Sequence, residues 1–315
     1  ALAGNPNVGK STVFNALTGL RQHTGNWPGK TIVRAEGAFA HQEKRVKLVD
    51  LPGTYSLQAG SMDEEVARDF ILFGRPDVTI VVVDATRLER NLNLTLQILD
   101  ISDQVVVYLN LIDEARRKGI AIDANQLERE LGVPVVSGVA RDNVGVEELL
   151  DRAHSLAVGK TSTTPYRLQS YSDDVEKTVA SLAQSVKSIF PNVPNTRWVA
   201  LRLLNADEAV VESVRTGELG QLGEESDRPA VLTNHRTQLV DSARRMRWDL
   251  PTDFHDRISE RLYDAAQKIA DKVQMRGLSK ARFDFDRALD GVLTSRLFGF
   301  PLMLAILAVV FWITI

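Results

Sequence analysis

The residues with the clearest chemical meaning lie at the start of the sequence, which contains the stretch GNPNVGKST. Gly4 to Ser11 fit the spacing G-x-x-x-x-G-K-[ST], in which glycines let the backbone curl and direct successive N–H groups at phosphate oxygens. A helix that starts directly after such a loop adds the partial positive charge of its N-terminus. The pattern predicts a phosphate-binding loop. Its expected nucleotide contacts are Asn5, Pro6, Asn7, Val8, Gly9, Lys10, Ser11 and Thr12.

Two further segments supply the groups that a bound nucleoside triphosphate requires. Lys10 is expected to bridge the β and γ phosphates, and the Ser11 hydroxyl to ligate Mg²⁺. Asp50 ends an apolar segment in DLPG, where its carboxylate would lie near the Mg²⁺ shell and the Gly53 N–H near the γ-phosphate. Lys10 and Gly53 are therefore predicted to be catalytic. DLPG on its own is also an ordinary turn sequence.

The stretch NLID, which follows another apolar segment, predicts the base that is bound. Asn110 and Asp113 bracket this motif, and a carboxylate there can accept hydrogen bonds from both N1–H and the exocyclic amine of guanine. Adenine lacks that pair of donors. An Asn and an Asp at strand ends are each common, so it is the order of the three motifs that favours a GTPase over a generic ATPase.

The elements that must position these residues alternate between short apolar strands and amphipathic helices. Near-continuous β-branched runs such as VTIVVVD are typical of strands buried on both faces of a mostly parallel sheet. The strands are predicted at 30–40, 45–51, 78–85, 105–111 and 133–138, the first two as an antiparallel edge pair, with helices at 11–20, 62–74, 92–101 and 123–132. The order predicts an α/β P-loop GTPase fold with helices on both faces of the sheet.

The pattern changes after residue 150. Residues 159–166, GKTSTTPY, are small, polar and contain proline, which is typical of a linker. Beyond them the strand signals end and apolar residues recur at helical spacing. Helices are expected near 175–189, 197–214, 230–247 and 253–276. The predicted domains are a GTP-binding domain at 1–158, the linker, an all-α helical bundle at 167–278, a juxtamembrane helix at 279–296 and a truncated transmembrane helix at 297–315.

Composition narrows the class of protein. The 315 residues contain no cysteine, which excludes disulfides and thiolate metal sites. Their net charge of −3 argues against a nucleic-acid partner. Residues 297–315 contain no charged side chain and are long enough to cross a bilayer; a buried core helix is the alternative. Basic residues before this run place the N-terminal part in the cytoplasm. We expect a clipped N-terminus, and further membrane protein after residue 315.

The motifs together resemble the family of ferrous iron transport proteins B (FeoB), in its N-terminal cytoplasmic part. The resemblance is carried by GNPNVGKST, by GNWPGKT at 25–31, by DLPGTYSL at 50–57 and by NLID, and it covers essentially the whole chain. It implies a GTP-hydrolysing module of a Fe²⁺ transporter that binds GTP or GDP and Mg²⁺.

Individual roles follow from the resemblance. Thr31 resembles the switch threonine that ligates Mg²⁺, with Ser11 and Asp50, only in the GTP state, and it is therefore expected to be catalytic together with Lys10 and Gly53. Asn7 resembles the asparagine that holds an activating K⁺; it could equally bond its own loop. Val139 and Ala140 stand where the family usually has Ser-Ala, with the Ala140 N–H available to guanine O6. Thr54 replaces the water-orienting glutamine of other GTPases and is too short for that role, so hydrolysis is expected to be slow.

The implied surroundings are the bacterial inner membrane, with residues 1–296 on its cytoplasmic side. The implied partners are the membrane-embedded remainder of the same polypeptide, small Feo accessory proteins and further copies of the chain. Two other functions stay open at this point. One is a soluble GTPase of ribosome or RNA maturation, which would need a basic RNA-binding domain. The other is a membrane-anchored regulatory GTPase that transports no ion.

Overall fold

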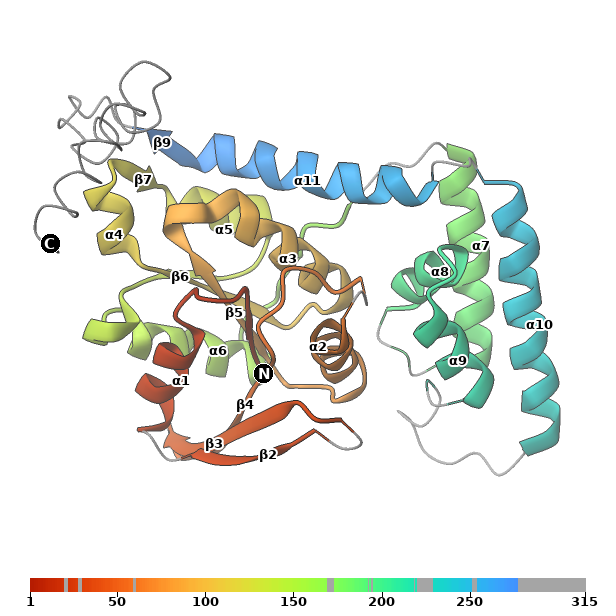
Figure 1. Cartoon of the computed structure of the whole chain (residues 1–315), viewed down its shortest axis with the longest axis horizontal. Coiled ribbons are helices and arrows are strands. Elements are labelled where there is room, and N and C mark those ends of the chain that lie inside the picture. Colours follow the sequence, from red (N-terminus) through yellow and green to blue (C-terminus); the bar gives the residue numbers. More distant parts are fainter. Residues whose placement is uncertain are drawn as a thin grey trace, which may run out of the picture. The chain divides into compact units, whose positions relative to one another are not determined.

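The computed structural model describes residues 1–19, 22–27, 30–58, 61–168, 173–191, 193, 195–217, 219, 229–250 and 254–276 (Figure 1). The predicted juxtamembrane helix at 279–296 and transmembrane helix at 297–315 lie outside these residues, as do Pro28 and Gly29 of GNWPG. Among the helices that are described, none combines the length and the apolar character that a bilayer crossing needs.

The N-terminal part is built around a seven-stranded sheet in the order β2-β3-β4-β1-β5-β6-β8 (Figure 1). Strands β1, β4, β5, β6 and β8 run parallel, while β2 and β3 are antiparallel additions at one edge. The bounds are β1 Leu2–Gly4, β2 Gln22–Asn26, β3 Val33–His41, β4 Lys44–Asp50, β5 Thr79–Asp84, β6 Val105–Asn110 and β8 Val135–Ser137. The predicted mostly parallel sheet and the antiparallel pairing of β3 with β4 are confirmed, but β2, which was not predicted, lies outside this pair at the edge of the sheet.

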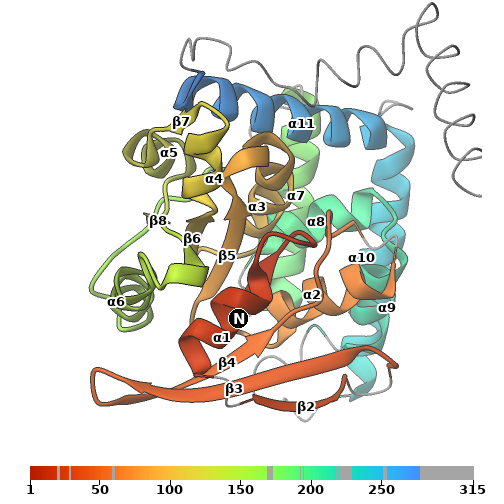
Figure 2. The same ribbon diagram turned by 60° about the vertical axis from the view of Figure 1, so that its left-hand side comes forward.

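Helices cover both faces of this sheet (Figure 2). They are α1 Lys10–Thr18, α2 Met62–Phe73, α3 Leu88–Ile101, α4 Ile112–Arg117, α5 Ala124–Leu131 and α6 Val146–Ala157, with short 3₁₀ turns η1 at Ala85–Arg87 and η2 at Ala140–Asp142. Successive side chains of a strand point to opposite faces. In β5, Ile80 and Val82 accordingly join the core beneath α1 and α6, whereas Val81 and Val83 join the core beneath α2 and α3.

The C-terminal part is helical, as predicted. Its helices are α7 Asp173–Ile189, α8 Thr196–Leu204, α9 Glu208–Thr216, α10 Pro229–Trp248 and α11 Phe254–Val273. The single helix expected over 197–214 is wrong. The chain breaks at Ala206, whose φ of 54° is left-handed, and restarts at Asp207, whose side chain accepts a hydrogen bond from the Val210 N–H. Such an N-cap begins a new helix.

Helix α11 returns to the N-terminal part and packs along α3 and α5 (Figure 1). Lys272 pairs with Glu130 of α5 at 2.8 Å, and the Asp123 N–H donates to the Val273 carbonyl. A two-stranded sheet joins β7 Ile120–Ile122 to β9 Gln274–Arg276. The sequence pattern predicted neither of these strands, nor β2, because three to five half-exposed residues carry no clear period-two signal.

Candidate nucleotide-binding site

The predicted motifs meet at one edge of the sheet. In parallel strands the carboxyl ends share an edge, so the loops that follow β1, β4, β6 and β8 lie together. These loops contain GNPNVGKS, DLPG, NLID and Val139–Ala140 respectively. Thr31 belongs to the same edge. Ala35 of β3 pairs with Asp50, the last residue of β4, and the two strands are antiparallel. The residues before Ala35 therefore extend beyond the carboxyl end of β4.

The loop after β1 has the conformation that its glycines predict. Gly9 caps α1 with a left-handed φ of 85°, a conformation that costs a side-chain-bearing residue free energy. A Cβ on Gly9 would also lie 2.4 Å from Nδ2 of Asn110. Asn5 is buried at 3% exposure and its Nδ2 has no hydrogen-bond partner within the described structure. A buried donor without a partner is costly, and phosphate oxygens are acceptors that would satisfy it.

Lys10 and Asp50 meet in this loop. The Lys10 Nζ lies 2.5 Å from Oδ1 of Asp50, and both side chains are mostly buried. Burial raises the pKa of the Asp50 carboxyl above its usual value, while the Lys10 ammonium partly offsets that effect. The predicted phosphate ligand and the predicted Mg²⁺ ligand are thus adjacent. A triphosphate could take the place of Asp50 beside Lys10, and a divalent cation could take the place of Lys10 beside Asp50. Each side chain would then still face an opposite charge.

The DLPG turn passes directly against the phosphate loop. A Cβ on Gly53 would come within 3.3 Å of the Pro6 Cα, so the backbone of Gly53 is as close as packing allows. Thr54 is buried at 4% exposure. Its hydroxyl therefore lies within the protein.

Thr31 lies in a tight turn that is anchored by Trp27. The Trp27 N–H donates to the Ile32 carbonyl and the Lys30 N–H to the Trp27 carbonyl. The Trp27 ring is buried, meets Phe70 of α2 edge to face at 5.3 Å, and is covered by the Arg34 guanidinium at 4.8 Å. Lys30 pairs with Glu65, also on α2. The turn that carries Thr31 is therefore tied to the helix that follows DLPG.

NLID connects two of the loops. The Asn110 side chain is buried; its Nδ2 donates to the Val8 carbonyl at 2.9 Å and its Oδ1 accepts from the Ala140 N–H at 3.0 Å. Leu111 then adopts a left-handed φ of 62°. A bulky residue in this region is a true outlier and is found mostly at functional sites.

Asp113 carries the feature that best fits a guanine base. Its Oδ2 is held by Arg117 at 2.8 Å and by Arg141 at 3.5 Å. Its Oδ1 is buried and has no partner among the described residues. An unpaired buried carboxylate oxygen is costly, and N1–H or the exocyclic amine of guanine would pair it.

Four other predicted residues are placed less specifically. Asn7 is exposed and has a left-handed φ of 65°, which asparagine tolerates well. Val139 is buried and is the N-cap residue of the η2 turn, which begins at Ala140. Ser11 and Thr12, at the start of α1, are both exposed.

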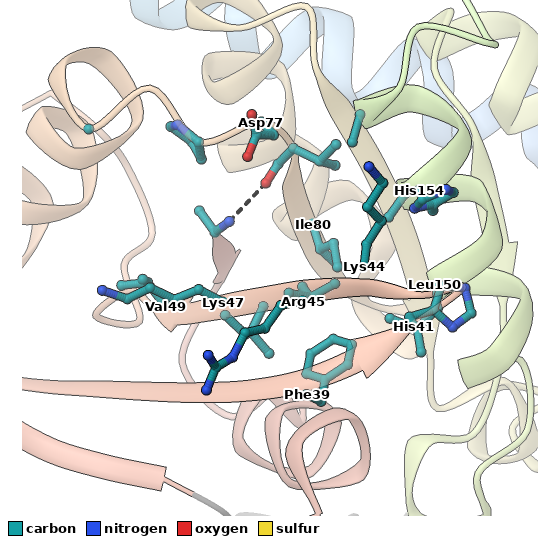
Figure 3. A pocket seen from close by; sticks show the side chains of 18 of the residues that line it. Phe39, His41, Lys44, Arg45, Lys47, Val49, Asp77, Ile80, Leu150 and His154 are labelled. Carbon is teal, nitrogen blue, oxygen red and sulfur yellow. Dashed lines mark hydrogen bonds between the residues drawn. The ribbon is translucent and has the colours of Figure 1, made fainter.

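A cavity of about 770 Å³ lies elsewhere, at the opposite edge of the sheet beside Ala1 (Figure 3). Its walls include Lys44, Arg45 and Lys47 of β4, with His154 of α6. No residue of the predicted nucleotide motifs lines it, so the site at the carboxyl edge and this cavity are separate.

One buried ion pair that joins the two parts of the chain was not predicted from the sequence. Arg68 of α2 is 1% exposed; it pairs with Asp69 at 2.9 Å and with Asp207, the N-cap of α9, at 3.4 Å. A signal was present, because Arg68 shares the apolar face of α2 with Ile71 and Leu72 at helical spacing. A charge on such a face needs a partner, but the sequence did not reveal which one.

Comparison with known proteins agrees with this geometry. Residues 1–153 match the family described as ferrous iron transport protein B, and residues 171–274 match the FeoB cytosolic helical domain. The Fe(2+) transporter FeoB of Escherichia coli strain K12 is 35% identical over 319 residues, which cover all of this chain and 38% of that protein. The chain thus spans well under half the length of such curated relatives.

Solved structures extend the match. The cytosolic domain of the T. maritima FeoB iron transporter in apo form is 31% identical, with a TM-score of 0.66 over 87% of this chain and 98% of that one. A GDP form of the same domain gives the same TM-score and identity and covers 96% of that chain. The chain therefore belongs to the FeoB family, of which it carries the N-terminal GTPase domain and the cytosolic helical domain.

Proposed function

We propose that this chain binds GTP and hydrolyses it slowly, and that it is the cytoplasmic module of a bacterial inner-membrane Fe²⁺ transporter. The observation that carries the GTP part is the meeting of four loops at one edge of the sheet, with the Asn110 amide bridging two of them. The transport part rests on membership of a family whose curated relatives are named Fe(2+) transporters.

The phosphate end of the site is assigned to the loop from Asn5 to Thr12. Its backbone N–H groups and Lys10 would hold the phosphates, and the Gly53 N–H would meet the γ-phosphate. Ser11, Asp50 and, in the GTP state, Thr31 would hold Mg²⁺. That ion supplies charge neutralisation of the phosphate oxygens. Lys10, now paired with Asp50, exchanges a carboxylate for a phosphate when nucleotide binds.

The base end is assigned to Asp113 and to the loop that begins at Val139. The free Oδ1 of Asp113 accepts from guanine. The Ala140 N–H already donates to Asn110, so its predicted contact with guanine O6 requires either sharing of that N–H or donation by the next amide, that of Arg141. Both arrangements use the same loop, and adenine, with an amine at that position, is rejected by both.

Slow turnover is proposed because the residue after Gly53 is Thr54, which is too short to orient water and is buried. Stabilisation of the transition state then falls to Lys10, backbone donors, Mg²⁺ and a K⁺ ion at Asn7. A slow GTPase acts as a switch. Loss of the γ-phosphate would release Thr31 and Gly53, and the ties from Trp27 to Phe70 and from Arg68 to Asp207 support transmission through α2 to the helical domain.

The decisive experiment is ferrous uptake by cells that carry the full-length gene, with and without Lys10→Ala. We expect uptake to fall with the variant, while Lys118→Ala, an exposed change next to α4, leaves it intact. Equal uptake by wild type and Lys10→Ala would remove the link to transport and leave only the GTPase. Sedimentation with membranes rather than with ribosomes would separate this function from an RNA-maturation GTPase.

A further inference from the structure

The loop that follows β8 is fastened at its far end by a tyrosine hydroxyl. Tyr108 of β6 is completely buried, and its hydroxyl donates to the Val144 carbonyl at 2.7 Å. The same carbonyl accepts from the Val139 N–H at 3.1 Å, and the Val144 N–H donates back to the Val139 carbonyl at 3.1 Å. Residues 139–144 therefore form a closed ring of backbone whose closing carbonyl is shared with Tyr108.

The fit around this hydroxyl is tight. A Cβ on Gly138 would lie 2.2 Å from the Tyr108 hydroxyl oxygen and 2.2 Å from the Val144 carbonyl oxygen, so only glycine leaves room for the contact. Gly138 is itself tied to the strand, because its N–H donates to the Leu109 carbonyl at 2.9 Å. The loop entrance and the loop closure are thus both fixed to β6.

Tyr108 and Asn110 act from the same face of one strand, since residues two apart in a strand point the same way. Asn110 holds the start of the η2 turn through the Ala140 N–H, and Tyr108 holds its end through Val144. The turn between them bears the amides of Ala140 and Arg141. Its position relative to a base at Asp113 is consequently set at two points of a rigid, buried strand.

We propose that the Tyr108 hydroxyl is a positioning residue for the guanine-binding loop, and that it slows release of bound nucleotide by holding the O6-contacting amide in place. This inference rests on the proposed function. Burial raises the pKa of Tyr108 to about 12, so the hydroxyl stays protonated and remains a donor throughout the range in which the protein would be assayed.

The test uses the full chain, Tyr108→Phe, and two ligands: mant-GDP and mant-labelled 6-thioguanosine diphosphate. The thio compound keeps N1–H and the amine for Asp113 but offers sulfur, a weak acceptor, in place of O6. Loss of one buried hydrogen bond predicts about three- to tenfold faster release of mant-GDP from the variant. Release of the thio ligand should change much less. Tyr263→Phe, on the exposed surface of α11, is the matched control.

Hydrogen exchange of individual backbone amides provides a second measurement. The Val139 amide, which donates to Val144, should exchange faster in Tyr108→Phe, whereas the Gly138 amide, which donates to Leu109, should not. A wild type that does not bind mant-GDP would overturn the proposed function. A wild type that binds it, with wild-type release from Tyr108→Phe, would overturn the role of Tyr108 alone. Equal acceleration of both ligands would show general loosening and would also refute the inference.

Discussion

Asn110 accepts a hydrogen bond from the Ala140 N–H at 3.0 Å while its amide nitrogen donates to the Val8 carbonyl. One buried side chain therefore fixes the distance between the predicted phosphate loop and the predicted base loop. Because both partners are main-chain groups, the link does not depend on any other side-chain rotamer.

Asn110→Ala should weaken mant-GDP binding by about 2–3 kcal/mol, since it leaves a buried donor and a buried acceptor without partners. Asn110→Asp separates the two contacts: it keeps an acceptor for Ala140 and loses the donor to Val8. The new carboxylate oxygen would face the Val8 carbonyl oxygen inside the protein, so affinity should fall at least as far as in Asn110→Ala. Thermal unfolding of each variant, followed without nucleotide, distinguishes a binding defect from a folding defect. Wild-type affinity in Asn110→Ala would contradict the bridging role.

Asp113→Asn should weaken GDP and GTP binding by about 2–3 kcal/mol through loss of a charge-assisted contact. The same variant should gain affinity for xanthosine diphosphate, because xanthine has a carbonyl where guanine has its exocyclic amine, and an asparagine amide can donate to it. Titration with both nucleotides checks this reversal. Glu114→Gln, one residue along α4, serves as the control. Unchanged GDP affinity would mean that the base lies elsewhere.

Trp27→Leu should lower GTP turnover and leave GDP affinity nearly unchanged. The change removes the ring that holds the Thr31 turn against Phe70 and Arg34, and Thr31 is proposed to act only with the γ-phosphate present. Single-turnover hydrolysis and mant-GDP titration measure the two effects. Trp248→Leu replaces a tryptophan that is 83% exposed and should affect neither. Parallel losses of turnover and GDP affinity in Trp27→Leu would point to a general packing defect.

Asp207→Asn should weaken the contact between the helical domain and α2 and lower the free energy of unfolding. Asparagine can still cap α9, because its side-chain oxygen can accept from the Val210 N–H, but Arg68 loses a buried countercharge. Removing one partner of a buried pair costs about 3–5 kcal/mol at most; Asp69 remains beside Arg68, so about half of that is expected. Denaturant unfolding measures the loss. The swap Arg68→Met with Asp207→Asn should recover stability, and no recovery would argue against direct pairing.

Turnover should be faster in potassium than in sodium salts if Asn7 helps to hold a monovalent cation. Asn7→Gly is the sharpest variant, because glycine accepts the left-handed backbone at this position without strain and removes the side-chain amide with its oxygen. It should erase the difference between the two salts. A wild-type rate that is indifferent to the cation would end the potassium proposal and leave GTP binding untouched.

The sequence by itself determined the parts of this protein that depend on local pattern. Glycine spacing predicted the phosphate loop, apolar runs predicted the buried parallel strands, and the order of GNPNVGKS, DLPG and NLID selected guanine nucleotides. These features are encoded within a few consecutive residues, so no distant contact is needed to recognise them.

Only the tertiary structure decided which distant residues meet. Arg68 finds Asp207 across 139 positions, Tyr108 finds Val144, and Lys10 finds Asp50, all through strand order and helix packing that no local window contains. The break at Ala206 and the short strands β2, β7 and β9 also depend on contacts that lie outside any local window. Their free energy comes from partners brought together by folding, and a linear pattern cannot specify a partner that it does not contain.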